Sequence, residues 1–310
     1  MLTCGLVILN FNEYPVTENL LRHVKDAPEI DHIVLVDNGS TDESFSVLSK
    51  YQNDKISLIQ SGRDGGYSFG NNFGVRYLIE NFHPDIIGIA NPDTIWDGSL
   101  VGRIKQVFED NPDYAVLSGF QLQPSGENGI HPFWENDNRL ASALRRTLIR
   151  PLRFIMDKLT SWQDYSAYLE GVRNSKNIPH QVWATEGSSF FIRREDFEAA
   201  GLFDENVFIY CEEDILAFKI DKWLHKKVGI VNSVTYIHAH KPWPKKLTLS
   251  VIRKILDNQR SIDKSAVYYF SHYVTDSRIL PVIYALLLKL GRIKIHALYM
   301  VRMMRQKLLG

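Results

Sequence analysis

The chain has 310 residues, of which 45% are hydrophobic, 23% charged and 12% aromatic. This length and composition exclude a disordered chain and suffice for the core of one large domain, or of one domain with an appendage. Positive and negative residues balance to a formal net charge of zero, so the chain as a whole offers no electrostatic argument for binding nucleic acid.

Apolar runs alternate with helical patterns through the first 120 residues. Short runs rich in β-branched residues predict strands at 6–9, 33–36, 57–59, 86–90 and 115–117. The segments between them predict helices at 15–24, 43–50, 70–80 and 99–109. This alternation favours an α/β fold with a mostly parallel sheet and helices on both faces. Further on, residues 182–193 return to a strand and turn pattern, and 215–223 have helical spacing.

The first two predicted strands end in small polar residues. Asn10 and Asn12 follow the first strand, and Asp37, Asn38 and Asp42 follow the second. Ligands of open α/β sheets bind outside the carboxyl ends of the strands. These side chains therefore predict a site for a polar small molecule, and a nucleoside would fit. Taken alone, the residues from Asp37 to Ser40 are equally consistent with a simple turn.

These two segments resemble the amino-terminal signature of family 2 glycosyltransferases, which are inverting nucleotide-sugar enzymes with the Rossmann-like GT-A fold. The resemblance continues in the same order through Asp-Gly-Gly-Tyr-Ser-Phe-Gly-Asn-Asn at 64–72, Asn-Pro-Asp at 91–93 and Phe-Ile-Tyr-Cys-Glu-Glu-Asp at 208–214. The ordered set is specific, and it covers most of the first 240 residues. It implies a GT-A catalytic domain over 1–240, and we expect 241–310 to be a carboxyl-terminal helical appendage.

For the donor, the resemblance implies contacts from Asn10, Asn12, Asp37 and Asn38, and also from the glycine-rich segment after the third strand. In that segment the candidates are Asp64, Gly66 and Asn72. Glycines there would let the backbone approach the donor, and the helix that follows could help to orient it. Asp64 stands where the family commonly has Asn. Without the family context, such a segment is usually only a loop.

For the metal, the resemblance points to Asn91 and Asp93, which follow the fourth strand. The family carries an Asp-X-Asp motif or a variant there, and it holds a divalent cation, Mg²⁺ or Mn²⁺, that bridges the two phosphates. Asn91 replaces the first Asp, as in bacterial rhamnosyl-type transferases, which leaves Asp93 as the main ligand. His238 and His240 follow a strand-like run and are further candidate ligands, with His238 slightly favoured; the alternative is an ordinary surface pair.

For catalysis, the resemblance points to three acids that precede the predicted helix at 215–223. The inverting reaction needs a carboxylate that takes the proton of the acceptor hydroxyl. Alignment on the downstream Leu216 and Lys219 makes Glu213 the base and Glu212 its partner, whereas alignment on the Glu-Asp dipeptide makes Asp214 the base. We favour Glu213. Without the motif order, the acids could simply complement a helix amino terminus.

Residues 185–194 resemble the strand that lines the acceptor side in the family. Gly187 is expected to allow close approach of a substrate. Glu186 could contact an acceptor hydroxyl, although a carboxylate at a strand end with no such role is an equal alternative.

The carboxyl-terminal appendage is basic and apolar. Residues 279–288 are apolar but too short to span a bilayer. The basic residues that follow stand among Ile, Leu, Tyr and Met with no acidic residue between them: Lys289, Arg292, Lys294, Arg302, Arg305 and Lys307. Such a segment can lie in the interface of an anionic membrane. The alternative is a helix packed on the catalytic domain, with its basic face in solvent.

The resemblance implies transfer of a hexosyl or deoxyhexosyl group from a nucleotide-diphosphate sugar to a lipid-linked saccharide acceptor in bacterial cell-surface polysaccharide assembly. Cys4 and Cys211 lie in apolar runs and no signal peptide precedes Leu2, so we expect a reduced, cytoplasmic location, peripheral at the inner membrane face. One alternative is a sugar-nucleotide nucleotidyltransferase, but the residues from Asn10 to Tyr14 do not form its phosphate loop. The other is a catalytically inactive binding protein on the same fold.

Overall fold

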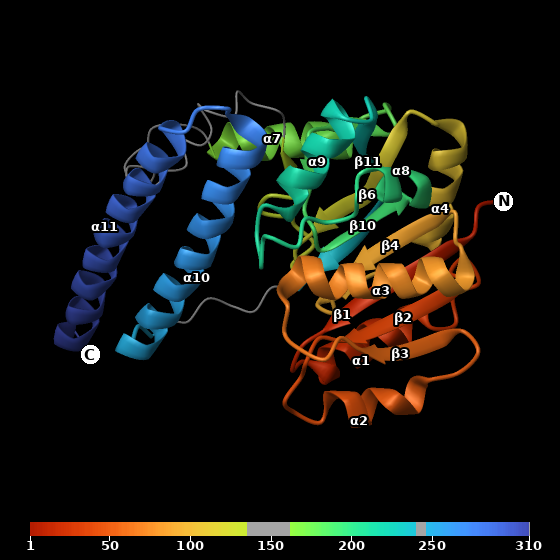
Figure 1. Cartoon of the computed structure of the whole chain (residues 1–310), viewed down its shortest axis with the longest axis horizontal. Helices are drawn as coiled ribbons and strands as arrows, with labels where there is room; N and C mark the ends of the chain where they lie inside the picture. The colour runs from red at the N-terminus through yellow and green to blue at the C-terminus, as the bar shows by residue number, and fades with distance from the viewer. Residues whose placement is uncertain (135–161, 240–245, 310) are drawn as a thin grey trace. The chain divides into compact units, whose positions relative to one another are not determined.

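The computed structural model of the chain describes residues 1–134, 162–239 and 246–309 (Figure 1). These residues form two compact units. The first contains 1–134, 166–208 and 212–239, and the second contains 162–165, 209–211 and 246–309. All the site residues predicted from the sequence lie in the first unit except His240, which is outside the described residues.

The first unit is built on a mixed sheet. Its strands lie in the spatial order β3 (Ile56–Gln60), β2 (His32–Asp37), β1 (Cys4–Asn10), β4 (Ile86–Ala90), β10 (Ser189–Arg193), β6 (Tyr114–Leu122), β11 (Lys227–His238) and β5 (Thr94–Ile95), and β8 (His180–Val182) pairs with β11. β3, β2, β1 and β4 are parallel. β10 is antiparallel to both of its neighbours, β4 and β6. A separate two-stranded sheet joins β7 (Phe133–Trp134) to β9 (Ala184–Thr185).

Helices cover both faces of this sheet, as the sequence predicts. Their bounds are α1 (Tyr14–Val24), α2 (Ser44–Leu48), α3 (Gly66–Phe82), α4 (Gly98–Asp110), α7 (Trp162–Arg173), α8 (Arg194–Ala199) and α9 (Glu212–Lys222), with a 3₁₀ turn at Ser49–Tyr51. The apolar sides of α1 and α4 share a core with one face of β1 and β2. α3 lies on the opposite face and is in front in Figure 1.

Close contact between α3 and the sheet depends on a glycine. A Cβ atom at Gly74 would lie 2.6 Å from Val36 Cγ2 and 2.7 Å from Val7 Cγ1. Both valines are completely buried, so neither has room to move away. This packing seats the middle of α3 on β1 and β2. The strand order also reverses at β1, between β2 and β4, which is where ligands bind in open α/β sheets.

The second unit contains a helical hairpin. α10 (Leu249–Tyr269) continues into a π-helical turn at Phe270–Val274, and α11 (Leu280–Leu309) returns antiparallel to it. Near one end Ile252 packs in a small core with Met303, and near the other the rings of Phe270 and Tyr284 lie 4.9 Å apart. The apolar and basic parts of the predicted appendage thus form one continuous helix, α11. Nowhere in the described ranges does a helix have the length and apolar character needed to cross a membrane.

Candidate active site

The ends of β1 and β2 are tied together by side-chain amides. Asn10 is fully buried; its amide donates to Ser40 Oγ at 3.2 Å, and its carbonyl oxygen accepts from the Thr17 hydroxyl at 2.7 Å. Asn12 has a positive φ of 55°, which Asn tolerates better than most residues. Its carbonyl oxygen accepts from the backbone N–H groups of Thr41 and Asp42 at 2.8 and 3.2 Å. The two asparagines therefore shape the loop after β2.

Asp37 and Asn38 connect this loop to its neighbours. Asp37 is buried and accepts from the amide of Gln60 at 3.3 Å. The Asn38 amide donates to Gly66 O at 3.2 Å and to Asp64 at 3.5 Å, and Asp64 also accepts from the N–H of Gly66 at 3.1 Å. The structure thus brings the end of β2 and the glycine-rich segment together, as the sequence predicts for one donor site.

Gly66 is at a position that only glycine can occupy without rearrangement. Its φ is +85°, and a Cβ atom there would lie 2.1 Å from the carbonyl oxygen of Phe208. The same carbonyl accepts from the N–H of Tyr67 at 2.8 Å. The first turn of α3 is therefore held against the chain that leads to the three acids of α9.

Asn72 serves the fold. It is buried on α3, and its amide donates to Phe203 O and to Glu205 Oε1, each at 2.9 Å. Its carbonyl oxygen accepts from the N–H of Phe203 at 3.1 Å. Both ends of the side chain are used to hold the 203–205 turn, which places Asn72 among the residues that support the site.

A second group of side chains gathers around His238, the last residue of β11. His238 Nε2 lies 3.3 Å from Asp93 Oδ1, and its Nδ1 lies 3.1 Å from Glu186 Oε2. The side chain of Gln121 contacts both His238 and Glu186. Burial lowers the pKa of His238, but the hydrogen bonds to Asp93 and Glu186 outweigh it and raise that pKa to about 9. The carboxylates of Asp93 and Glu186 therefore stabilise a positive charge placed between them.

Asn91 shapes the turn that carries Asp93. Its N–H donates to Ser188 O at 2.7 Å, and its carbonyl oxygen accepts from the Thr94 hydroxyl at 2.8 Å. The N–H of Ala239 donates to the carbonyl oxygen of Asp93 at 2.8 Å. These contacts fix Asp93 beside β11, so that its carboxylate faces His238.

The three acids of the 212–214 cluster lie in the first turn of α9, which begins three residues earlier than the sequence predicts. Glu212 and Asp214 are buried, with 4% and 7% of their surfaces exposed, whereas Glu213 is partly exposed. Asp214 accepts from the indole N–H of Trp134 at 2.9 Å. One carboxylate oxygen of Glu212 is buried with no hydrogen-bond partner among the described residues. Of the three acids, Glu213 is thus the most accessible.

The carboxylate of Glu213 is held by the backbone of Gly187. The N–H of Gly187 donates to Glu213 Oε1 at 3.0 Å, and the carbonyl oxygen of Gly187 accepts from the Tyr67 hydroxyl at 2.6 Å. A Cβ atom at Gly187 would lie 2.6 Å from Glu213 Oε1, so glycine is required for this approach. The sequence predicts that Gly187 allows close approach of a substrate; in the structure the group that approaches it is the Glu213 carboxylate.

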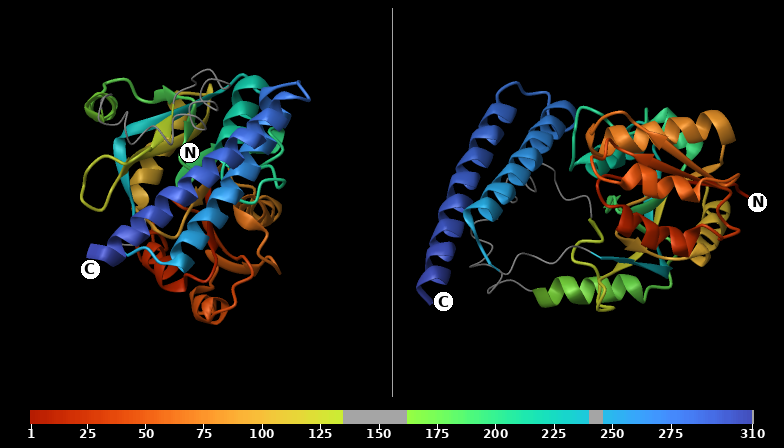
Figure 2. Two further views of the ribbon diagram at one scale, coloured as in Figure 1. Left: turned by 90° about the vertical axis from the view of Figure 1, so that its left-hand side faces the viewer. Right: turned by 90° about the horizontal axis from the view of Figure 1, so that it is seen from below.

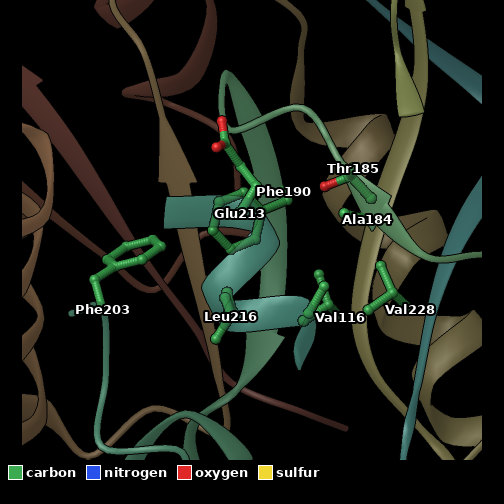
Figure 3. A pocket seen from close by; sticks show the side chains of 9 residues that line it. Val116, Ala184, Thr185, Phe190, Phe203, Glu213, Leu216 and Val228 are labelled. Carbon is green, nitrogen blue, oxygen red and sulfur yellow. The ribbon is translucent and has the colours of Figure 1, made fainter. Parts of the chain in front are cut away.

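The surroundings of Glu213 alter its ionisation. Figure 3 shows its carboxylate at one end of a small pocket whose other side chains are mostly apolar, among them Phe203 and Leu216. Burial, followed by the nearby charges of Asp214 and Glu186, raises the pKa of Glu213 to about 7, against the lowering effect of its backbone hydrogen bonds. A carboxylate with such a pKa can exchange protons near neutral pH.

Sequence reasoning did not single out Tyr67 or Gln121. Gln121 lies near the carboxyl end of β6, where the same strand-end rule that selected Asn10 would have found it. Tyr67 contacts Gly187 across 120 positions of the chain, and nothing in its local sequence indicates that contact.

With this geometry in place, comparison with known proteins assigns the family. The family model described as "Glycosyl transferase family 2" matches residues 6–199, more than half of the chain. The chain therefore belongs to glycosyl transferase family 2, and its fold is of the GT-A type.

Two curated relatives and one solved structure illustrate the similarity. The "Low-salt glycan biosynthesis hexosyltransferase Agl10" of Haloferax volcanii is 25% identical over 209 residues, which are 67% of this chain but only 58% of that relative. The "N-acetylglucosaminyl-diphospho-decaprenol L-rhamnosyltransferase" of Mycobacterium tuberculosis is 25% identical over 248 residues, 71% of each chain. The mannosyltransferase PcManGT of Pyrobaculum calidifontis, solved with GDP-Man and Mn²⁺, has a TM-score of 0.52 at 14% identity, over 99% of this chain and 88% of that one.

Replacement of Asn72 tests whether it supports the fold or binds the donor. Asn72→Ala leaves the buried backbone groups of Phe203 without their partners, so the free energy of unfolding should fall by about 2–3 kcal/mol. The Michaelis constant for the donor should be nearly unchanged. Asn81→Ala, at an exposed position of the same helix, is the matched control and should change stability by less than about 0.5 kcal/mol. A raised Michaelis constant with unaltered stability would restore the donor-binding role.

Proposed function

We propose that this protein is an inverting glycosyltransferase that moves a sugar from a nucleotide-diphosphate sugar to a hydroxyl group of a saccharide acceptor. One observation carries the proposal: the consecutive residues Glu186 and Gly187 connect the side chains around His238 with the carboxylate of Glu213. Glu186 contacts His238, which faces Asp93, and the next residue, Gly187, binds the carboxylate of Glu213. One short loop thereby holds both the Asp93–His238 pair, which could bind a cation, and the candidate base Glu213.

The donor side fits Mg²⁺ or Mn²⁺. Asp93 Oδ1 and His238 Nε2 lie 3.3 Å apart. The carboxylate oxygen suits either cation, and the imidazole nitrogen would join it once the cation has replaced the proton on the ring. No group of three or more His, Cys, Asp or Glu side chains within the described ranges could hold a metal by itself. One carboxylate from the protein, with the remaining ligands supplied by diphosphate and water, is a usual arrangement for Mg²⁺. When bound, the metal would neutralise charge on the departing nucleotide.

Neighbouring side chains orient the Asp93 and His238 pair for binding a cation. Glu186 hydrogen-bonds Nδ1 of His238, which fixes the orientation of the ring and leaves Nε2 directed at Asp93. Gln121 contacts the same two side chains and limits their movement. The first turn of α3, joined to Asn38 and Asp64, supplies the polar surface for the nucleotide.

The acceptor side centres on Glu213. In the reaction the acceptor oxygen attacks the anomeric carbon while the bond from that carbon to the phosphate oxygen breaks. The acceptor proton passes to Glu213, and the bonding electron pair leaves with the nucleoside diphosphate. Because a single carboxylate acts as base and attack comes from the face opposite the leaving group, the anomeric centre is inverted. The pKa of about 7 suits a base that works near neutral pH.

The names of the two curated relatives suggest the chemical class of the donor sugar and of the acceptor. One acts as a hexosyltransferase in glycan biosynthesis, and the name of the other gives rhamnose as its sugar and a polyprenyl-diphosphate saccharide as its acceptor. We therefore propose a hexosyl or deoxyhexosyl donor and a lipid-linked saccharide acceptor in cell-surface glycan assembly. A lipid-linked acceptor would be met at the inner face of the membrane, which is the location we propose.

The alternatives receive less support. A nucleotidyltransferase would need a phosphate loop after β1, where Asn10 and Asn12 instead bind the loop after β2. An inactive binding protein would have no need of the Glu213 carboxylate and its positioning by Gly187.

The first test of this function is the base. Glu213→Gln removes the proton acceptor while keeping the side chain's size, so turnover should fall by a factor on the order of 10²–10⁴ while donor binding persists. Asp214→Asn keeps an oxygen for the Trp134 indole and is the matched control, with a smaller loss. Release of nucleoside diphosphate with and without acceptor is the assay. Loss of turnover in Asp214→Asn, with Glu213→Gln active, would make Asp214 the base.

The second test is metal dependence. EDTA should stop transfer, and added Mg²⁺ or Mn²⁺ should restore it. Asp93→Ala should weaken donor binding as well as turnover, because the metal contacts the diphosphate in both the ground and transition states. Calorimetry of donor binding gives the first effect and diphosphate release the second. Asp110→Ala, at an exposed position on α4, should match the wild type. Full activity in EDTA would rule out this part of the proposal.

A further inference from the structure

α11 exposes an apolar face along most of its length. Val282, Leu286, Leu290, Ile293, Ala297, Val301 and Met304 follow one another at spacings of three or four residues, so they lie on one side of the helix. All seven are exposed, and the six larger side chains have between 45% and 63% of their surface open. We call these seven residues the apolar stripe. At 1.5 Å per residue it extends over roughly 33 Å.

The opposite face of α11 is already occupied. Met303 is buried against α10, and Tyr284 is buried against Phe270 of the π-helical turn that continues α10. Arg292 pairs with the buried Asp263 of α10. Both views in Figure 2 show the two helices side by side. Packing against α10 therefore accounts for one face of α11, and within the described residues of the second unit the stripe is uncovered. Exposed apolar surface of this extent marks an interaction site.

Basic side chains border the stripe on both sides. At about 100° per residue, Lys289 lies along one edge, and Lys294 and Arg305 lie along the other. All three are exposed. There is no Asp or Glu between 280 and 309. Long basic side chains at the edges of an apolar face can keep their charged ends in a layer of lipid headgroups while the apolar face enters the acyl region.

The charges also decide between possible occupants. A second copy of α11 packed on the stripe would bring two sets of Lys289 and Lys294 together with no acidic partner, which is unfavourable. An acidic surface would instead complement them. We propose that the apolar stripe and its basic edges dock the protein on the surface of an anionic lipid bilayer, with α11 lying in the plane of the interface.

Flotation of the full-length protein with vesicles tests this proposal without requiring turnover, so its failure is distinct from failure of the proposed activity. The protein should float with phosphatidylcholine vesicles that contain phosphatidylglycerol, and less with phosphatidylcholine alone. High salt should weaken the binding, because it screens the basic residues.

Two variants separate the contributions. Leu286→Gln, Leu290→Gln and Ile293→Gln together should lower vesicle partitioning at least about tenfold, because each removes apolar surface from the lipid. Lys289→Gln with Lys294→Gln should lower binding to anionic vesicles by roughly thirtyfold at low salt, at about 1 kcal/mol for each charge. Arg253→Gln with Lys254→Gln removes the same charge from exposed positions of α10 and is the matched control, which should bind like the wild type.

Thermal unfolding and light scattering complete the test. The triple variant of Leu286, Leu290 and Ile293, which we call the stripe variant, should have the unfolding temperature and the oligomeric state of the wild type. No flotation of the wild type at low salt, or flotation of the stripe variant at the wild-type level, would overturn the proposal. If the wild type does not float and the stripe variant unfolds at a lower temperature, the stripe packs against another part of the protein, which also contradicts the proposal. Loss of a dimer on substitution, without change in vesicle binding, would make the occupant a second copy.

Discussion

The peptide group of Gly187 is the contact on which the geometry of the site depends. Its N–H binds the carboxylate of Glu213, and its carbonyl oxygen binds the hydroxyl of Tyr67. Three elements meet at this one residue: the loop before β10, the first turn of α9 and the first turn of α3. A side chain at this position would displace the Glu213 carboxylate, so the absence of a Cβ atom is a condition for holding the candidate base.

The same loop also positions the residues of the proposed donor side. Glu186, one residue earlier, holds His238 toward Asp93, and Ser188 O, one residue later, accepts from the N–H of Asn91. The proposed donor side and acceptor side are therefore positioned by three consecutive residues between β9 and β10. β10 is inserted antiparallel between β4 and β6, which places this loop at the carboxyl end of β4. The antiparallel strand thereby brings the acceptor-side loop to the edge of the sheet where the donor-side residues lie.

The sequence predicts local features of this arrangement well and long-range ones poorly. The β-branched runs at 6–9 and 33–36 identify β1 and β2, because a buried strand must be apolar throughout. The position of β10 could not be derived, since strand pairing depends on contacts far apart in the chain. The sequence predicts the start of α9 three residues too late, because acidic residues are equally compatible with a turn and with the first turn of a helix. The motif makes Asn72 a candidate donor residue, whereas its contacts with Phe203, which no local pattern indicates, favour a supporting role.

Stereochemistry tests the central claim most directly. If Glu213 acts as a base and no side chain forms a covalent intermediate with the sugar, the product must have the anomeric configuration opposite to that of the donor. Once a donor and an acceptor are identified, the anomeric proton and carbon of the product can be measured by NMR. The account predicts complete inversion. A product that retains the configuration of the donor would contradict it.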